Sequence, residues 1–148
     1  MDKDLIIVNF SEMLKELISE KNLTFKQFAI DIGVSESTVF RWIKNPLQIN
    51  RPNLIKIADY FECLIEYILG RSKNDIQIVP KSCPHFTDRV RMIMKEQNIS
   101  TYTLEKTSKF KCSYFTQWNK GNEPALQTLL ELADFFNCTI DYLVGRET

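Results

Sequence analysis

An internal repeat limits what this chain can fold into more than any other feature of its sequence. Residues 61–71, FECLIEYILGR, return as residues 136–146, FNCTIDYLVGR. When one residue is dropped and the alignment is extended backwards, Trp42 falls on Trp118 and Asn22 falls on Asn98. The length of 148 residues alone would suggest one domain, but the repeat indicates two copies of a unit of about sixty residues.

We expect the first copy to span residues 1–71, the second copy to span residues 85–148, and a linker to join them at residues 72–84. Two prolines and polar ends mark this linker. Its middle, Ile-Gln-Ile-Val at residues 76–79, is apolar and is expected to dock partly on a domain. A unit of this size buries only ~60% of its unfolded surface, so contact between copies or between chains is expected to add stability.

Each copy is expected to consist of five short helices, because apolar residues recur at helical spacing and the chain has only 4 Gly and 5 Pro. In the first copy the apolar face of the first helix runs through residues 10–18. Thr24 stands three residues before Gln27, which is the pattern of a capping box at the start of a second helix. We expect Gly33 to end that helix in a left-handed conformation and Ser35 to cap the third helix.

Residues 24–42, TFKQFAIDIGVSESTVFRW, resemble the helix-turn-helix of the Cro/repressor (XRE) family of bacterial and phage regulators. The residues that carry this resemblance are Phe28, Ala29, Gly33, Val34, Ser35, Val39 and Trp42. Residues 58–71 also resemble the last two helices of that family. The resemblance implies an all-α fold of two tandem five-helix, lambda-repressor-like domains. It also implies sequence-specific binding of duplex DNA and, usually, repression of transcription.

In a helix-turn-helix the third helix of the domain enters the major groove, which is ~12 Å wide. Its outward side chains are then the candidates for reading bases, namely Glu36, Ser37, Thr38, Phe40 and Arg41. Arg41 can pair with guanine, Glu36 can accept from cytosine, and Phe40 can touch the thymine methyl group. Lys26 and Lys44 flank these positions and suit phosphates. The family often has Gln, which touches a phosphate, where this chain has Phe25.

The second copy departs further from the motif, because Glu105 replaces the small Ala29 and Lys109 replaces Gly33. A glutamate there must swing out or hold the two helices apart. Lysine in a left-handed turn costs ~1–2 kcal/mol, so we expect Lys109→Gly to stabilise this copy.

The second copy nevertheless has four lysines and no acid between residues 106 and 120. Gln117 is suited to reading adenine. The candidate DNA contacts in this copy are Thr101, Cys112, Ser113, Tyr114, Thr116, Gln117 and Lys120. A role for this copy in dimerisation or partner binding is the alternative.

Composition and motifs exclude several other functions. With 19 Lys and Arg, 19 Asp and Glu and one His, the chain has no strongly basic tail. It has no Gly-rich phosphate loop and no nucleophile motif, so we expect no enzyme activity and no cofactor. Cys83 and His85 are a lone pair of metal-ligand types, and without a second pair we expect no metal site. No signal sequence and no run of ~18 apolar residues is present, so we expect a cytoplasmic protein without a membrane partner.

The function that we expect is that of a sequence-specific, double-stranded DNA-binding regulator of transcription, acting as a repressor. The alternative is an interaction module of a phage or mobile element that uses helix-turn-helix units for docking or dimerisation, and the zero net charge mildly favours it. No small-molecule ligand is evident, and an inducer would need a pocket between the copies.

We expect a homodimer that reads a palindromic site through one copy of each chain. The apolar segments 5–8 and 76–79 are candidates for its contact surface. The competing arrangement is a monomer whose two motifs reach successive major grooves of an asymmetric site.

Overall fold

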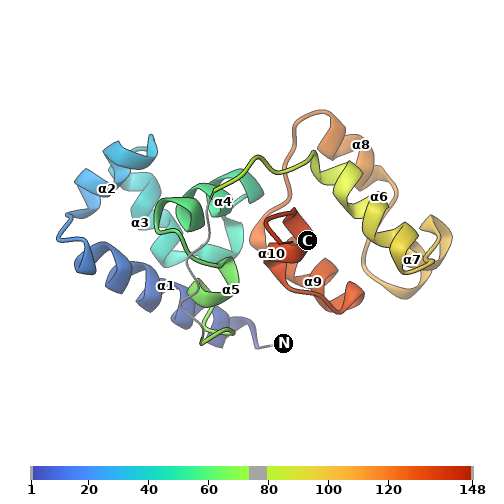
Figure 1. Ribbon diagram of the computed structural model, residues 1–148, viewed down its shortest axis with the longest axis horizontal. Helices are drawn as coiled ribbons and strands as arrows, with labels where there is room; N and C mark the ends of the chain where they lie inside the picture. Colours follow the sequence, from blue (N-terminus) through green and yellow to red (C-terminus); the bar gives the residue numbers. More distant parts are fainter. Residues whose placement is uncertain (1, 74–79, 148) are drawn as a thin grey trace. The chain divides into compact units, whose positions relative to one another are not determined.

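The computed structural model describes residues 2–73 and 80–147, and within them all regular structure is helical (Figure 1). The chain divides into two compact units, Met1–Pro80 (unit 1) and Lys81–Thr148 (unit 2). The expected all-α fold is thereby confirmed. The apolar segment 76–79 lies outside the described residues.

The α-helices of the two units correspond one to one along the chain. Unit 1 contains α1 (Lys3–Glu20), α2 (Phe25–Ile32), α3 (Glu36–Lys44), α4 (Arg51–Tyr60) and α5 (Ile65–Ile68), with a short 3₁₀ helix, η1 (Pro46–Gln48), after α3. Unit 2 contains α6 (Phe86–Glu96), α7 (Thr101–Thr107), α8 (Ser113–Asn119), α9 (Leu126–Phe136) and α10 (Ile140–Val144). By the repeat, α1 to α5 correspond to α6 to α10.

The first helix is longer than the apolar face at residues 10–18 predicts. It begins at Lys3 because the Asp2 side chain caps it, with Oδ1 accepting from the Leu5 amide at 3.2 Å. The apolar segment 5–8 therefore forms the first turns of α1. Ile6 is buried, whereas Leu5 and Val8 are more than half exposed.

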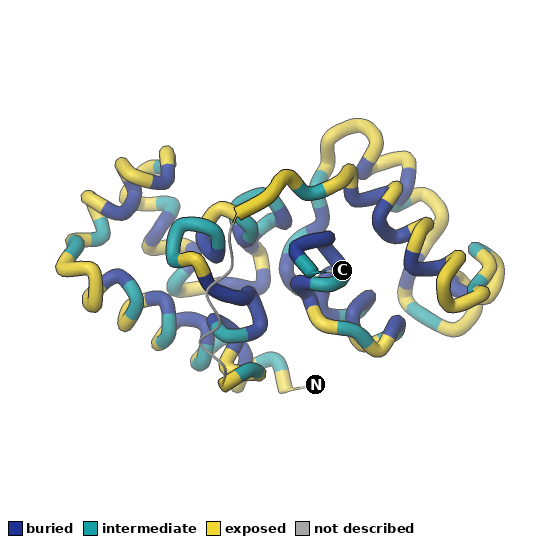
Figure 2. The backbone as a smooth tube through the Cα atoms, in the orientation of Figure 1, coloured by how far each residue is buried: buried dark blue, intermediate teal, exposed yellow. Residues whose placement is uncertain are grey.

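The core of unit 1 lies where α1 crosses α3 and α5, and where α2 packs against α3 and α4. Along these helices buried residues alternate with exposed ones at helical spacing (Figure 2). Aliphatic and aromatic side chains fill the centre, including Phe10, Leu14, Ile18, Phe28, Val39, Leu54, Ile57 and Leu69.

Unit 2 repeats most of this packing. Helix α6 packs against α8 and α10, and α9 packs against α10. Its core includes Phe86, Val90, Ile93, Leu104, Leu129, Phe136 and Leu143. The exception is α7, which makes much less contact with α8 than α2 makes with α3.

The turns between helices also repeat. Three left-handed positions of unit 1 have left-handed counterparts in unit 2, and the pairs are Asn22 and Asn98, Glu62 and Asn137, and Gly70 and Gly145. Glycine and asparagine tolerate this conformation best, so five of these six residues suit their backbone. The fourth left-handed position of unit 1, Gly33, has no such counterpart.

An ion pair closes the last helix of each unit. In unit 1 the Arg71 guanidinium donates two hydrogen bonds to the Glu66 carboxylate, each at 2.8 Å. In unit 2 Arg146 Nη1 donates to Asp141 Oδ1 at 2.5 Å, and both side chains are buried. Because each arginine follows its helix by a few residues, the pair ties the chain back onto the fold.

Candidate nucleic-acid interface

Helices α2 and α3 form a tightly capped helix-turn-helix. The predicted capping box is present, with the Gln27 amide donating to Thr24 Oγ1 at 3.1 Å and Gln27 Oε1 accepting from the Thr24 amide at 2.8 Å. Gly33 ends α2 with φ of +82°, as predicted. No atom lies within 4 Å of a Cβ built there, so backbone conformation and not space demands glycine. Ser35 caps α3 by accepting from the Thr38 amide at 3.2 Å, also as predicted.

The two faces of α3 differ sharply in burial. Val39 and Trp42 are buried in unit 1. The opposite face carries predicted contact residues, and all but the half-buried Thr38 are exposed: Glu36, Ser37, Thr38, Phe40, Arg41 and Lys44. We call this set the α3 surface. Lys26, the predicted phosphate contact on α2, is also exposed.

A chain of hydroxyl groups holds Arg41 in place on the α3 surface. Ser35 Oγ lies 3.0 Å from Ser37 Oγ and 2.7 Å from Thr38 Oγ1. Thr38 Oγ1 in turn accepts from Arg41 Nη2 at 3.0 Å. A guanidinium group has five N–H donors, so this contact orients Arg41 and leaves further donors directed to solvent. Such orientation lowers the entropy that Arg41 would lose on pairing with a base.

Phe25 has a structural role that the sequence did not indicate. Its ring meets the Phe40 ring edge to face, with the centroids 5.3 Å apart. Phe40 stays 49% exposed and can still touch a thymine methyl group. Phe25 thus joins the start of α2 to the middle of α3.

A hollow of about 410 Å³ borders the α3 surface, and sequence reasoning missed half of the polar residues that line it. The hollow is lined by Thr38, Arg41, Trp42, Lys44, Asn45, Gln48 and Asn53. Asn45, Gln48 and Asn53 were not predicted as contacts. The signal was available around η1, where Leu47 and Ile49 are buried while Asn45 and Gln48 alternate with them and stay exposed. These amides can donate to phosphate oxygens.

The turn between α7 and α8 differs from its counterpart in unit 1, and the prediction that Lys109 adopts a left-handed conformation is wrong. Helix α7 ends at Thr107, and Ser108 is extended, with φ of −135°. Ser108 Oγ donates to the Leu104 carbonyl at 2.5 Å and accepts from the Phe110 amide at 3.1 Å. These side-chain bonds replace the left-handed turn, so the premise for stabilisation by Lys109→Gly is removed.

Glu105 swings out into solvent, which is one of the two outcomes expected for it. Its Oε1 accepts from the Cys112 amide at 2.8 Å, at the start of α8. This hydrogen bond lowers the pKa of Glu105. Desolvation, and then the Glu105 carboxylate, raise the pKa of the Cys112 thiol. Glu105 therefore serves as a cap for α8 from a neighbouring helix.

The predicted contact residues of unit 2 are only partly available. Cys112, Ser113, Thr116, Gln117 and Lys120 are exposed, and Thr101 is half-buried. The expectation that Tyr114 faces outward needs correction, because its ring is half-buried beside Phe110 and Trp118, at centroid distances of 5.4 and 6.1 Å. Gln117 Oε1 accepts from Asn122 Nδ2 at 2.7 Å, so part of its adenine-reading pattern is engaged.

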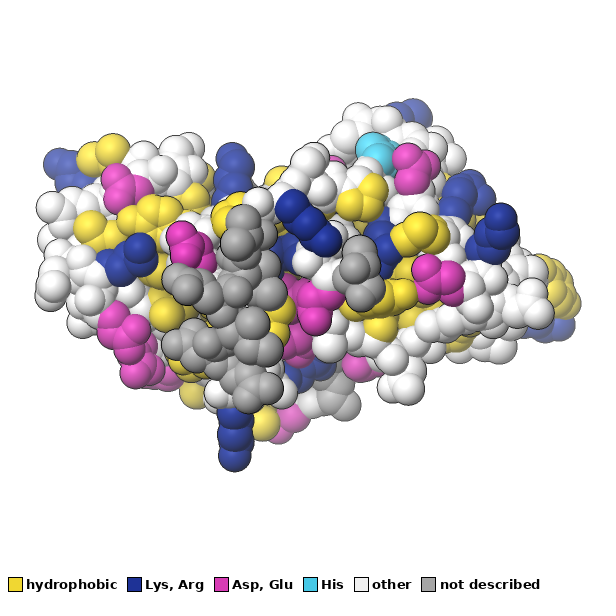
Figure 3. All heavy atoms as spheres, viewed as in Figure 1, with side chains coloured by type: hydrophobic (Ala, Val, Ile, Leu, Met, Phe, Trp, Pro, Cys, Tyr) yellow, Lys and Arg dark blue, Asp and Glu magenta, His cyan; other side chains and the backbone are white. Residues whose placement is uncertain are grey.

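Neither positive nor negative side chains dominate the surface that Figure 3 draws. On the face drawn in Figure 3, basic and acidic side chains are interspersed over both units. Of the lysines between residues 106 and 120, Lys106 donates to the Tyr102 hydroxyl at 2.7 Å. Within residues 2–73 and 80–147, no cluster of metal-ligand side chains is found, and no helix is long and apolar enough to cross a membrane.

Comparison with known proteins gives one result. A family model for the Cro/C1-type HTH DNA-binding domain matches residues 13–74 and, a second time, residues 89–148. The two matches fall on the two copies of the repeat. No curated protein and no solved structure matches the chain significantly.

Proposed function

This chain belongs to the family of Cro/C1-type helix-turn-helix DNA-binding domains, and we propose that it is a sequence-specific regulator of transcription that acts as a repressor. The observation that carries the proposal is the α3 surface. It combines an oriented Arg41 with further polar and basic side chains on a helix whose other face is fixed in the core. A rigid helix of this kind presents its donors to a major groove without further ordering.

Base reading falls to α3 in this proposal. Arg41 pairs with a guanine, Glu36 accepts from a cytosine, and Phe40 contacts a thymine methyl group. Lys26, Lys44 and the side-chain amides that line the hollow beside α3 hold the phosphates on either side. Unit 2 adds phosphate contacts through its exposed lysines and reads few bases, because Tyr114 is packed and Gln117 is partly engaged.

We further propose that the protein acts as a homodimer on a palindromic operator. Two α3 helices would then reach half-sites ~34–36 Å apart on one face of the DNA. The exposed Leu5 and Val8 on α1 supply apolar surface for such contact. The competing arrangement is a monomer that uses α3 and α8 together on an asymmetric site. Light scattering followed by footprinting separates them, since the dimer gives twice the mass of the chain and symmetric protection, whereas the monomer gives the mass of one chain and asymmetric protection.

The experiment that tests the DNA-binding proposal is selection of duplexes from a random library, followed by affinity measurement at several salt concentrations. We expect an enriched motif and a log–log slope of about −0.9 per phosphate neutralised. A reporter gene placed behind the enriched site is expected to fall in expression when the protein is made.

Docking to another protein is the second candidate function, and the balanced charge of the chain favours it. It predicts no enriched DNA motif and no salt-dependent DNA binding. Those two results together would refute the proposed regulator.

A further inference from the structure

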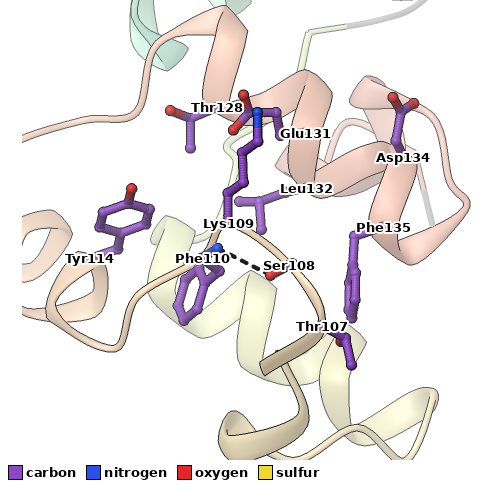
Figure 4. Close-up of a pocket in the computed structure, with 10 residues that line it drawn as sticks. All are labelled: Thr107, Ser108, Lys109, Phe110, Tyr114, Thr128, Glu131, Leu132, Asp134 and Phe135. Atoms are coloured by element: carbon purple, nitrogen blue, oxygen red, sulfur yellow. Dashed lines mark hydrogen bonds between the residues drawn. The ribbon is translucent and has the colours of Figure 1, made fainter. Parts of the chain in front are cut away.

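Unit 2 contains a cavity that is separate from the α3 surface described above. It measures about 270 Å³ and opens between the turn after α7 and one side of α9. Figure 4 shows side chains from the turn, from α8 and from α9 around it. Its apolar walls are Phe110, Leu132 and Phe135, and its polar rim includes Lys109, Tyr114, Thr128, Glu131 and Asp134.

Unit 2 lacks a contact that unit 1 has at the positions that correspond to this cavity. In unit 1 the Tyr60 hydroxyl donates to Asp31 Oδ2 at 2.8 Å and so joins the end of α4 to the end of α2. The repeat places Phe135 and Thr107 at these two positions. Phenylalanine has no hydroxyl group to donate, and the buried Ile32 of α2 is replaced by Ser108. Helix α7 therefore lacks the hydrogen bond that joins α2 to α4 in unit 1. It also lacks the buried apolar side chain at its C-terminal end.

The chemistry of the lining selects a particular class of ligand. Aromatic walls favour a flat apolar ring, with stacked or edge-to-face contacts. The rim holds two carboxylates against one ammonium group, and neither carboxylate has an ion-pair partner among the described residues. A volume near 270 Å³ is at the lower end for ligand pockets, so one ring with a short side chain fits.

We propose that this cavity binds a small aromatic ligand that carries a positive charge. The ring lies against Phe110 and Phe135, and the cationic group lies at the rim beside Glu131. Occupancy fixes the turn at residues 108–112 and Tyr114 relative to α9. Because Tyr114 belongs to α8, the ligand biases the position of the helix that faces DNA in unit 2. Ligand binding is independent of the proposed function, and only this coupling to DNA rests on it.

The binding step is tested with phenethylamine and with phenylacetate, which has the same ring and the opposite charge. Amide shifts of the full-length protein are followed by NMR during each titration. We expect phenethylamine to give saturable shifts at residues 107–114 and 128–135, with a dissociation constant of about 1 mM or tighter. The counterpart residues 31–38 and 53–60 of unit 1 serve as the internal control and are expected to stay unchanged. Equal binding of phenylacetate, or shifts spread over both units, would overturn the proposal.

Two variants locate the site, and one matched variant controls for charge. Glu131→Gln is expected to weaken phenethylamine binding by about tenfold or more, through loss of a charged contact. Thr128→Phe is expected to abolish the shifts by filling the cavity while the rest of the spectrum is retained. Asp88→Asn removes the same charge from an exposed position on α6 and is expected to leave affinity unchanged. If Asp88→Asn weakens binding as much as Glu131→Gln does, the cavity is not the site.

The coupling step is tested by measuring DNA affinity with and without saturating phenethylamine. We expect a change of about fivefold or more in the native protein and none in Thr128→Phe. Unchanged affinity in the native protein would overturn the coupling while the NMR result stands. A protein that binds phenethylamine but no DNA at all would instead refute the proposed function and leave the ligand site intact.

Discussion

Helices α2 and α7 occupy the same place in the repeat, yet only α2 is firmly held. Three side chains of α2 are buried, Phe28, Ala29 and Ile32, whereas α7 buries Leu104 alone. The first motif is thus a rigid platform for α3, and the second is an open one with a cavity beside it. A difference of a few residues at a helix junction is enough to change how firmly the second helix of the motif is held.

The largest expected effect comes from placing in α2 of unit 1 the glutamate that α7 of unit 2 has at the matching position. Ala29 is 1% exposed between α2 and its neighbours, so Ala29→Glu places a charge in the core. We expect a loss of about 3 kcal/mol or more in the stability of unit 1, together with loss of DNA binding. Denaturant unfolding monitored by circular dichroism measures it. The reverse change, Glu105→Ala, is the matched control and should cost much less, because Glu105 is exposed and only its hydrogen bond to the Cys112 amide is lost.

The next largest effect is expected for DNA affinity, which should depend more on the base-reading residue of unit 1 than on that of unit 2. Arg41→Ala is expected to weaken binding to the selected site by roughly 1–3 kcal/mol and to relax preference at one base pair. Gln117→Ala in unit 2 should have a smaller effect, because its side chain is already engaged by Asn122. Fluorescence anisotropy on selected and random duplexes measures both.

Lys44→Ala is the control for Arg41→Ala. As a phosphate contact, Lys44 should affect all sequences alike and reduce the salt slope by about 1. If Arg41→Ala lowers selected and random affinity by the same factor, Arg41 contacts only phosphate and α3 does not read bases in the way proposed.

Substitutions at the matching positions 33 and 109 should show that only the turn of unit 1 requires glycine. Gly33→Ala forces a Cβ into a left-handed residue and is expected to cost ~1–2 kcal/mol. Lys109→Gly should bring no gain and a small loss, since Lys109 does not have positive φ and glycine adds disorder to the unfolded chain. Thermal melting of each full-length variant tests the pair. A higher midpoint for Lys109→Gly would mean that the turn of unit 2 has the left-handed form after all.

A smaller gain is expected from rebuilding the missing contact in unit 2. The double variant Thr107→Asp/Phe135→Tyr supplies the hydroxyl group and the carboxylate that join α4 to α2 in unit 1. We expect about 0.5–1.5 kcal/mol of added protection for α7 in amide hydrogen exchange. Each single variant alone should give no gain. Equal protection in the single and double variants would show that this hydrogen bond is not what separates the units.

The smallest expected effect is the response of α8 to acid. The folded state lowers the pKa of Glu105 below its usual value of 4.5. Its contribution is therefore fully present above that value and is lost as pH falls through the lowered folded-state pKa. In this acidic window the Cys112 amide should lose its protection from hydrogen exchange, while the Thr38 amide, which donates to a hydroxyl group in unit 1, should keep it.

Much of the fold could be predicted because local chemistry determines it. Three features satisfy backbone groups within a few residues: the capping box at Thr24, the cap at Ser35 and the glycine at position 33. Each can therefore be predicted from one short stretch of sequence. The polar, exposed side of α3 follows from helical spacing in the same way.

The features that were missed depend on contacts between separate segments. The Ser108 side chain forms hydrogen bonds with two backbone groups in place of a left-handed turn. A serine at that position does not by itself predict these hydrogen bonds. Tyr114 was expected outward by spacing alone, but the extra room left by α7 lets it pack beside Phe110. The start of α1 was missed because its cap, Asp2, precedes a segment that has no helical pattern of its own.

The ion pairs that close each unit bear on how the chain is made. Arg71 follows the last helix of unit 1 directly, so every residue that this unit needs has left the ribosome before unit 2 is complete. Domains of this size generally fold as units during synthesis, the N-terminal one first. Unit 1 can therefore close and protect its core while α9 and α10 are still being added. Unit 2 must wait for Arg146, the residue whose guanidinium group pairs with the buried carboxylate of Asp141.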